Sequence, residues 1–162
     1  MFAWLRAFLF LHYNEKRIKE ELKMKPTLNI AACVLVEGGK ILATKRNLDR
    51  ISGGYYEFPG GKIEPGETPK ETIRREVKEE LGDEIIIGQK IPTPTDFEYS
   101  YAYIHIHFYL AKLKTHNLKQ IAAHDFIWDY PKNLENLNWL LAAQPVVKWL
   151  ATRNLTKEEF NE

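Results

Sequence analysis

Short apolar runs alternate with polar segments along this chain, and the pattern predicts strands gathered around one charged helix. Residues 28–36 (LNIAACVLV) form an almost unbroken apolar run that predicts a buried strand. After a turn at residues 37–40, residues 41–46 predict a second strand, which makes a hairpin. The other predicted strands span residues 55–58, 84–91 and 125–129, together with 97–114 as either a hairpin or one long strand.

The remaining segments complete this arrangement. Residues 47–54 and 115–124 predict loops, residues 132–137 a helical turn, and residues 142–153 a final helix. Strands that resume after a helix predict an α/β (α+β) fold, in which helices cover both faces of a mixed sheet.

The central helix is predicted over residues 69–81, after a turn-rich loop. Thr68 is a suitable N-cap, Pro69 takes the first helical position, and Glu71 can complete a capping box. Gly82 is expected to end the helix.

Three glutamates on this helix share one face, because Glu76, Glu79 and Glu80 stand at i, i+3 and i+4. Like charges at this spacing repel each other. A divalent cation would relieve the repulsion, since Mg²⁺ prefers carboxylate and phosphate oxygens. We therefore expect the three glutamates to be metal ligands, with a solvent-exposed charged face as the open alternative.

Composition limits the partners and the compartment. The 162 residues, 44% of them hydrophobic, suit one domain with a core. A net charge of +1 provides no broad basic surface, so no nucleic-acid polymer is expected as a partner. The single cysteine, Cys33, excludes an internal disulfide and favours a cytoplasmic location.

The two ends differ from the middle of the chain. The domain is expected to span residues 25–155, between a helical extension at 1–24 and a C-terminal tail at 156–162. Residues 1–11 are apolar apart from Arg6, and they are shorter than the about 20 residues of a transmembrane helix. The extension is open to three readings: a membrane-surface anchor, a segment packed on the domain, or an artefact of start-site choice.

The spacing of residues from the turn-rich loop into the helix resembles the signature of the Nudix hydrolases. The matching residues are Gly61, Glu67, Arg75, Glu76, Glu79, Glu80 and Gly82. Asp83 departs from the signature, which has an aliphatic residue there, so the helix exit is expected to be one residue longer or packed differently. The segment EFPGGKIEPGETP is similar to the MutT-like branch, the nucleoside triphosphate pyrophosphohydrolases of the 8-oxo-dGTP diphosphatase type, and the likeness covers about residues 28–150.

This resemblance implies a Nudix-type αβα sandwich and a Mg²⁺- or Mn²⁺-dependent hydrolase. The implied reaction converts nucleoside triphosphates to nucleoside monophosphate and pyrophosphate, with nucleotide pool sanitation of oxidised substrates such as 8-oxo-dGTP as one role. It adds the Gly60 carbonyl to the metal ligands and favours Glu76 as the general base. Arg75 is expected to pair with Glu67 and orient the loop, in a catalytic role or only as a structural link. The residues matched to substrate binding are Arg46, Glu57, Phe58 and Pro59.

Departures from the family pattern leave some questions open. Ala123 stands before His124, where many members carry a glutamate, and Ala143 stands where MutT carries a base-reading asparagine. Base specificity, sugar specificity and oligomeric state are therefore open. The alternatives in function are a hydrolase of nucleotide sugars or dinucleoside polyphosphates, and a non-catalytic nucleotide-binding module.

His105 and His107 share one face of a predicted strand, together with Tyr101 and Tyr103. An ordinary sheet face is favoured over a metal-binding pair.

Overall fold

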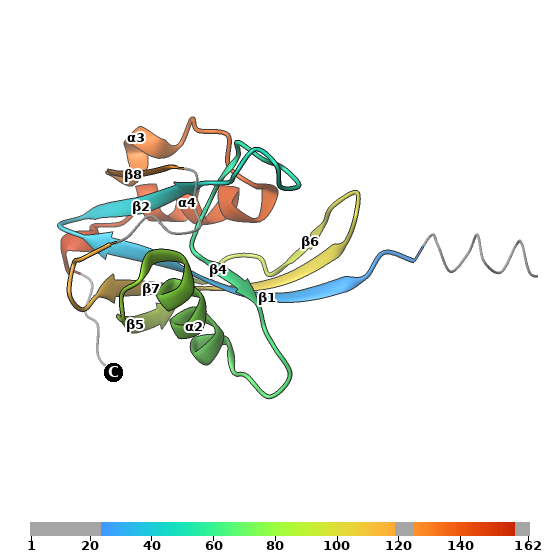
Figure 1. Cartoon of the computed structure of the whole chain (residues 1–162). Coiled ribbons are helices and arrows are strands. Elements are labelled where there is room, and N and C mark those ends of the chain that lie inside the picture. Colours follow the sequence, from blue (N-terminus) through green and yellow to red (C-terminus); the bar gives the residue numbers. More distant parts are fainter. Residues whose placement is uncertain (1–23, 119–124, 158–162) are drawn as a thin grey trace, which may run out of the picture.

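A central pair of parallel strands organises the computed structural model, which describes residues 24–118 and 125–157 (Figure 1). β1 (Thr27–Glu37) runs parallel to β7 (Tyr103–Leu113), and antiparallel strands extend the sheet on both sides. The other strands of the described sheet are β2 (Lys40–Lys45), β3 (Tyr56–Glu57), β4 (Gly60–Lys62), β5 (Ile85–Lys90), β6 (Asp96–Glu98) and β8 (Asp125–Asp129).

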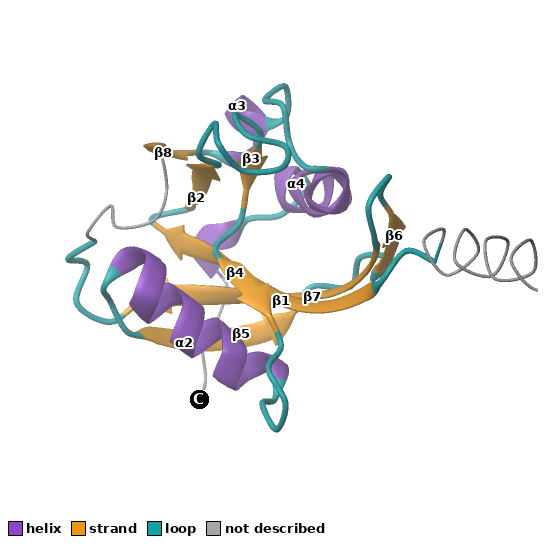
Figure 2. Cartoon of the chain, turned by 45° about the vertical axis from the view of Figure 1, so that its right-hand side comes forward, coloured by secondary structure: helices purple, strands orange, loops and turns teal. Residues whose placement is uncertain are grey.

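Helices cover both faces of this mixed sheet, α2 (Pro69–Leu81) on one side and α4 (Gln144–Ala151) on the other (Figure 2). β1 is buried on both faces because its alternate side chains enter two cores. The residues packed on the α2 side are Ala31, Cys33 and Leu35, and those on the α4 side are Ala32, Val34 and Val36. This arrangement confirms the αβα sandwich and explains the unbroken apolar run of the first strand.

The ends of α2 follow the predicted signals. The Thr68 side chain accepts a hydrogen bond from the Glu71 N–H, and the Glu71 carboxylate accepts one from the Thr68 N–H at 2.7 Å. Gly82 ends the helix in the left-handed conformation, with φ 74°. Asp83 follows as a buried residue whose Oδ1 accepts a hydrogen bond from Thr115 Oγ1 at 2.8 Å. The helix is therefore not one residue longer, but its exit is packed through a carboxylate instead of an aliphatic side chain.

The segment before α2 is partly a strand, where the sequence predicts only a turn-rich loop. β4 pairs antiparallel with residues 30–32 of β1. A Cβ atom on Gly60 would lie 2.3 Å from the Ala31 carbonyl oxygen, so this close approach needs a residue without a side chain. The strand predicted at residues 55–58 is shorter in the structure, where only the two residues of β3 form a strand.

The C-terminal helix is shorter than predicted. The 3-10 helix η1 (Leu141–Ala143) precedes α4, because Pro145 has no N–H to donate to the carbonyl four residues earlier. The turn predicted at 132–137 is α3 (Pro131–Leu134), which starts earlier because proline favours the first helical position. A second 3-10 helix, η2 (Leu155–Lys157), follows α4.

Residues 97–114 form the hairpin of β6 and β7, which was one of the two predicted arrangements. Within residues 24–118 and 125–157, no helix is long and apolar enough to cross a membrane. The extension before Met24, with the membrane contact predicted for residues 1–11, and the Ala123–His124 pair lie outside the described residues.

Candidate active site

A pocket of about 250 Å³ opens between the sheet, η1 and the loop that joins β2 to β3. Most of its wall is apolar and includes Leu28, Ile30, Ile104, Ile106 and Phe108. The charged residues in its lining are Arg46, Arg50, Glu57 and Lys62. An apolar interior with a few polar groups is typical of a site for a small organic ligand.

Glu76 and Glu80 of α2 contact the two glycines of β4, which also line the pocket. A Cβ atom on Gly61 would lie 2.1 Å from Glu76 Oε1, so the carboxylate occupies the space that a side chain would fill. Glu80 Oε2 accepts a hydrogen bond from the Gly60 N–H at 3.3 Å. The two carboxylates thus contact neighbouring glycines of a strand that lines the pocket.

Negative charge accumulates around Glu80. Burial raises the pKa of Glu80 to about 8, and the charges of Glu57 and Glu76 add to the effect, while the Arg50 charge opposes it. The pKa of Glu57 is also raised, first by burial, although Arg46 and Arg50 act to lower it. The Glu57 carboxylate of β3 is therefore part of the same cluster of negative charge as Glu76 and Glu80 of α2.

Arg75 fastens the loop before α2 to the helix. Its Nε and Nη2 donate to the two carboxylate oxygens of Glu67 at 2.7 and 3.0 Å, which confirms the predicted pair. Hydrogen bonds from Arg75 first, and from Thr72, lower the pKa of Glu67 to about 2. Arg75 Nη1 also donates to Glu76 Oε1 at 2.8 Å, so the same guanidinium orients the carboxylate that contacts β4.

Glu79 is set apart from the other two glutamates. Its side chain is 60% exposed and its Oε2 lies 3.5 Å from Arg75 Nη1, whereas the Glu76 side chain is 17% exposed. The structure brings Glu76 and Glu80 together at β4, and Glu79 lies further out. Its role as a metal ligand stays a prediction.

Three of the four residues predicted to bind substrate line the pocket. Arg46, directly after β2, forms an ion pair with Glu57 of the neighbouring strand β3. Phe58 is buried and stacks on Trp139, with 4.8 Å between the ring centroids. Pro59 has a structural task, since its carbonyl accepts a hydrogen bond from a backbone N–H of β1.

The carboxylates match a hard divalent cation in their chemistry. Glu57, Glu76 and Glu80 offer oxygen ligands, and their mutual repulsion would be relieved by a cation such as Mg²⁺. Among the residues that the structure describes, no group of three or more His, Cys, Asp or Glu side chains is arranged to hold a metal ion. Metal binding at these residues is thus a prediction from donor chemistry.

Several residues of the pocket had no functional assignment from the sequence, and Arg50, Tyr99 and Ala142 are among them. Arg50 lies in a polar loop without any periodic pattern that marks it. The Tyr99 hydroxyl accepts a hydrogen bond from the Ala142 N–H at 3.0 Å, a contact between segments far apart in the chain. Ala143, which stands at the expected asparagine position, does line the pocket.

His105 and His107 lie away from this pocket. His105 Nδ1 is 2.7 Å from Asp96 Oδ1, and the two histidine rings contact edge to face. His105 pairs with Asn29 of β1 on one side and with Asp96 of β6 on the other, so it lies within the sheet. The predicted shared face is wrong for Tyr101, which precedes β7 and lines the pocket on the other side.

Comparison with known proteins gives a family and several partial relatives. A model described as the NUDIX domain matches residues 25–154. The chain is 36% identical over 64 residues to a CTP pyrophosphohydrolase from Escherichia coli (strain K12), which covers 40% of this chain and 47% of the relative. It is 40% identical over 62 residues to an 8-oxo-dGTP diphosphatase from Proteus vulgaris, covering 38% of this chain and 55% of the relative. The chain therefore matches these curated relatives over about half of their length.

Solved structures match over a larger part of the chain. One is described as the DNA mismatch repair protein MutT (family Nudix hydrolase) from methicillin-resistant Staphylococcus aureus 252. It is 29% identical with a TM-score of 0.65, and the match covers 80% of this chain and 98% of that one. A MutT protein from Methanosarcina mazei Go1 has a TM-score of 0.69 at 22% identity, over 78% and 94% of the two chains, and it supports the fold alone.

Proposed function

The chain belongs to the Nudix family, and we propose that it hydrolyses nucleoside triphosphates to nucleoside monophosphate and pyrophosphate with Mg²⁺ or Mn²⁺. The observation that carries this proposal is the position of Glu76 and Glu80, two carboxylates held against the glycines of β4 beside an apolar pocket. Such a pocket suits a nucleoside. A triphosphate can approach carboxylates only when cations neutralise the negative charges of both groups. Glu76 and Glu80 are suited to hold such cations.

The charged residues of α2 and of the loop before it have separate tasks in this proposal. Glu76, Glu79 and Glu80, with the Gly60 carbonyl of β4, would hold the divalent cation. When bound, the cation screens the phosphate charge and acidifies the attacking water. Glu76 accepts a proton from that water as general base. The Arg75–Glu67 pair keeps the loop and the Glu76 carboxylate in position.

Oxidised nucleotides such as 8-oxo-dGTP are among the proposed substrates. The partial likeness to the Proteus vulgaris 8-oxo-dGTP diphosphatase supports this choice. The stacked rings of Phe58 and Trp139 pack beside the apolar pocket, where stacking and apolar contacts would accept any base. The buried free thiol of Cys33 and the nucleotide substrates support a cytoplasmic location as part of the same proposal.

A panel of nucleotides tests the proposal directly. The full chain is incubated with each nucleoside triphosphate, an ADP-sugar and a dinucleoside polyphosphate, and the products are separated. We expect Mg²⁺-dependent release of pyrophosphate from triphosphates, and none after chelation. Release of single phosphate, or exclusive turnover of the ADP-sugar, would contradict the proposed reaction. Nucleotide binding without any turnover would favour a non-catalytic module.

A further inference from the structure

The loop between β2 and β3 has a defined backbone structure. At its base, the Arg46 N–H donates to the Tyr55 carbonyl at 2.9 Å. Within the loop, the Gly53 N–H donates to the Arg50 carbonyl at 2.9 Å. A Cβ atom on Gly53 would lie 2.7 Å from Leu48 Cα, so the two arms of the loop are in close contact. The loop therefore fixes the backbone from which the Arg50 side chain extends.

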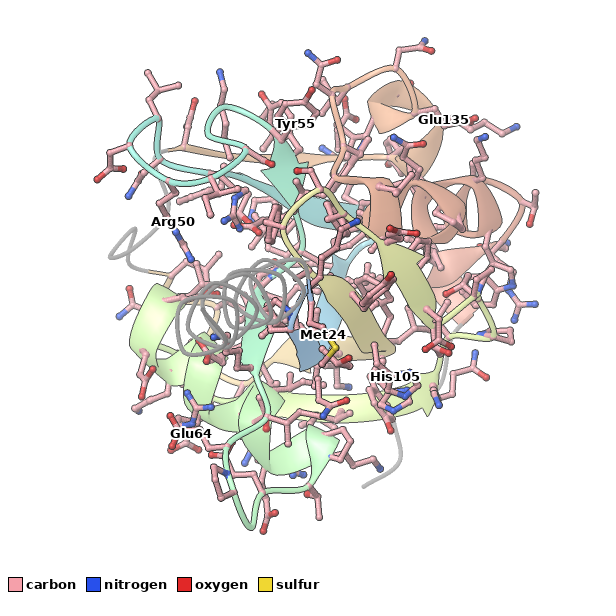
Figure 3. The ribbon with its side chains drawn as sticks, turned by 90° about the vertical axis from the view of Figure 1, so that its right-hand side faces the viewer. Met24, Arg50, Tyr55, Glu64, His105 and Glu135 are labelled. Atoms are coloured by element: carbon pink, nitrogen blue, oxygen red, sulfur yellow. The ribbon has the colours of Figure 1, made fainter. Side chains whose placement is uncertain are left out.

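The two arginines of this segment differ in what they contact. The Arg46 guanidinium is engaged by the Glu57 carboxylate and donates from Nε to the Ile51 carbonyl at 3.0 Å. Arg50 is exposed and lines the pocket, and no described carboxylate forms an ion pair with it at contact distance. Figure 3 shows the Arg50 side chain extending from the loop toward α2.

The Arg50 charge acts on the carboxylates that surround the glycines of β4. It lies close enough to Glu57 and Glu80 to oppose the rise that burial causes in the pKa of both carboxyl groups. Gly60 and Gly61 line the same pocket as Arg50. Arg50 thus places a positive charge at the charged end of the pocket, near the carboxylates. The other arginine of this segment, Arg46, is already paired with Glu57.

We propose that Arg50 binds the phosphate chain of the substrate, an inference that rests on the proposed function. A divalent cation at Glu80 would neutralise one of the two carboxylates, Glu57 and Glu80, that now attract Arg50. Phosphate oxygens would then be its anionic partner, and the planar guanidinium matches their geometry. A contact to the phosphates of the bound substrate should act mainly on affinity, and so on KM more than on kcat.

Binding of inorganic tripolyphosphate, which carries no base, tests this role without knowledge of the nucleoside. The full chain, Arg50→Gln, Arg50→Lys and the control Arg153→Gln are titrated with tripolyphosphate in the presence of Mg²⁺. Arg153 gives the same charge change on the surface beyond α4, where its guanidinium lies over the Trp149 ring. We expect Arg50→Gln to weaken binding by about 10–100-fold, Arg50→Lys by less, and Arg153→Gln by no more than about two-fold. Melting temperatures should stay unchanged, which a merely structural role of Arg50 would not give.

Two results would overturn the role of Arg50. One is a wild-type chain that does not bind tripolyphosphate, and the other is equal binding by wild type and Arg50→Gln.

Nucleotide hydrolysis separates this inference from the proposed function. An active wild type whose KM is unaffected by Arg50→Gln refutes the role of Arg50 and leaves the enzyme intact. An inactive wild type that binds tripolyphosphate through Arg50 refutes the enzyme and supports the phosphate contact.

Discussion

Gly61 and Glu76 share one small volume where β4 contacts α2. Because a Cβ atom on Gly61 would meet the end of the Glu76 side chain, Gly61→Ala should displace that carboxylate and spare the fold. We expect kcat to fall by about 100-fold, the effect of a misplacement of about 1 Å, with little change in melting temperature. Steady-state kinetics and thermal unfolding measure the two quantities. Full activity in Gly61→Ala would show that the position of Glu76 does not matter.

Glu80 is a carboxylate of the site whose pKa burial raises to about 8. Glu80→Gln removes a predicted metal ligand and with it several kcal/mol of transition-state stabilisation. We therefore expect kcat to fall by about 100–1,000-fold. Metal-free stability should hold or rise slightly, since a neutral side chain is not repelled by Glu57 and Glu76. Glu84→Gln, on an exposed residue beyond the helix, is the matched control. Wild-type rates for Glu80→Gln with Mg²⁺ would refute the metal-ligand role.

Ala143 bears on the choice of base. Selectivity arises when a wrong base leaves a buried polar group unpaired, and alanine offers no such group. We expect hydrolysis of several nucleoside triphosphates, with 8-oxo-dGTP preferred over dGTP by about 10–100-fold, as one or two hydrogen bonds would give. Specificity constants for 8-oxo-dGTP, dGTP and dCTP measure this. A preference of about 10,000-fold or more would mean that another residue reads the base.

Residues within the helix and its loop were easier to predict than residues of the pocket. The Arg75–Glu67 pair follows from a motif of fixed local spacing, and the structure confirms it. Arg50 and Tyr99 reach the pocket only through a folded loop and a distant hairpin, and no periodic pattern announces such a contact. The more exposed position of Glu79 was also not predictable, because i, i+3 and i+4 spacing defines a face but not how deeply each side chain is buried.

At the scale of elements, Asp83 joins the end of α2 to the end of β7. Burial opposes its ionisation, but hydrogen bonds from Thr115 and from nearby backbone N–H groups outweigh this and lower its pKa. Asp83→Asn replaces an acceptor by a donor there, and should reduce the free energy of unfolding by about 1–3 kcal/mol at neutral pH. Urea unfolding measures the loss, with Asp49→Asn on an exposed loop residue as the control.

The contribution of Asp83 also has a defined pH dependence. Its pKa is lowered in the folded state, so the stabilisation is fully present above the unfolded value of about 3.9 and is lost as pH falls through the lower folded value. The difference between wild type and Asp83→Asn should therefore be constant above about pH 4 and shrink below it. A difference that grows in acid would contradict this assignment.

Strands and helices with strong local signals were predicted, and β4 and η1 were not. The limits of α2 and β8 agree with the sequence, since caps and an apolar run mark them. β4 has two glycines and a lysine, a composition that indicates a turn, and it becomes a strand only because β1 offers a partner at very short distance. Tertiary contact thus outweighs local preference at the element that meets the carboxylates.

At the scale of the whole molecule, the NUDIX match covers residues 25–154, and every residue assigned to the candidate site lies within it. A chain that starts at Met24 is therefore expected to fold and to hydrolyse nucleotide like the full chain. Melting temperature and kcat/KM compare the two. A large loss in either would show that residues 1–23 pack on the domain, whereas loss of membrane association alone would support the anchor.

The parallel pairing of β1 with β7 has a consequence for how the candidate site is assembled. Thr27 pairs with Tyr103 and Leu35 with Ala111, so a long stretch of chain must be closed into a loop before the centre of the sheet exists. That loop contains β4, α2 and the Arg50 segment. Because such distant contacts form slowly, we expect the charged groups of the candidate site to come together late in folding. A partly synthesised chain that lacks β7 would have no sheet centre on which to assemble them.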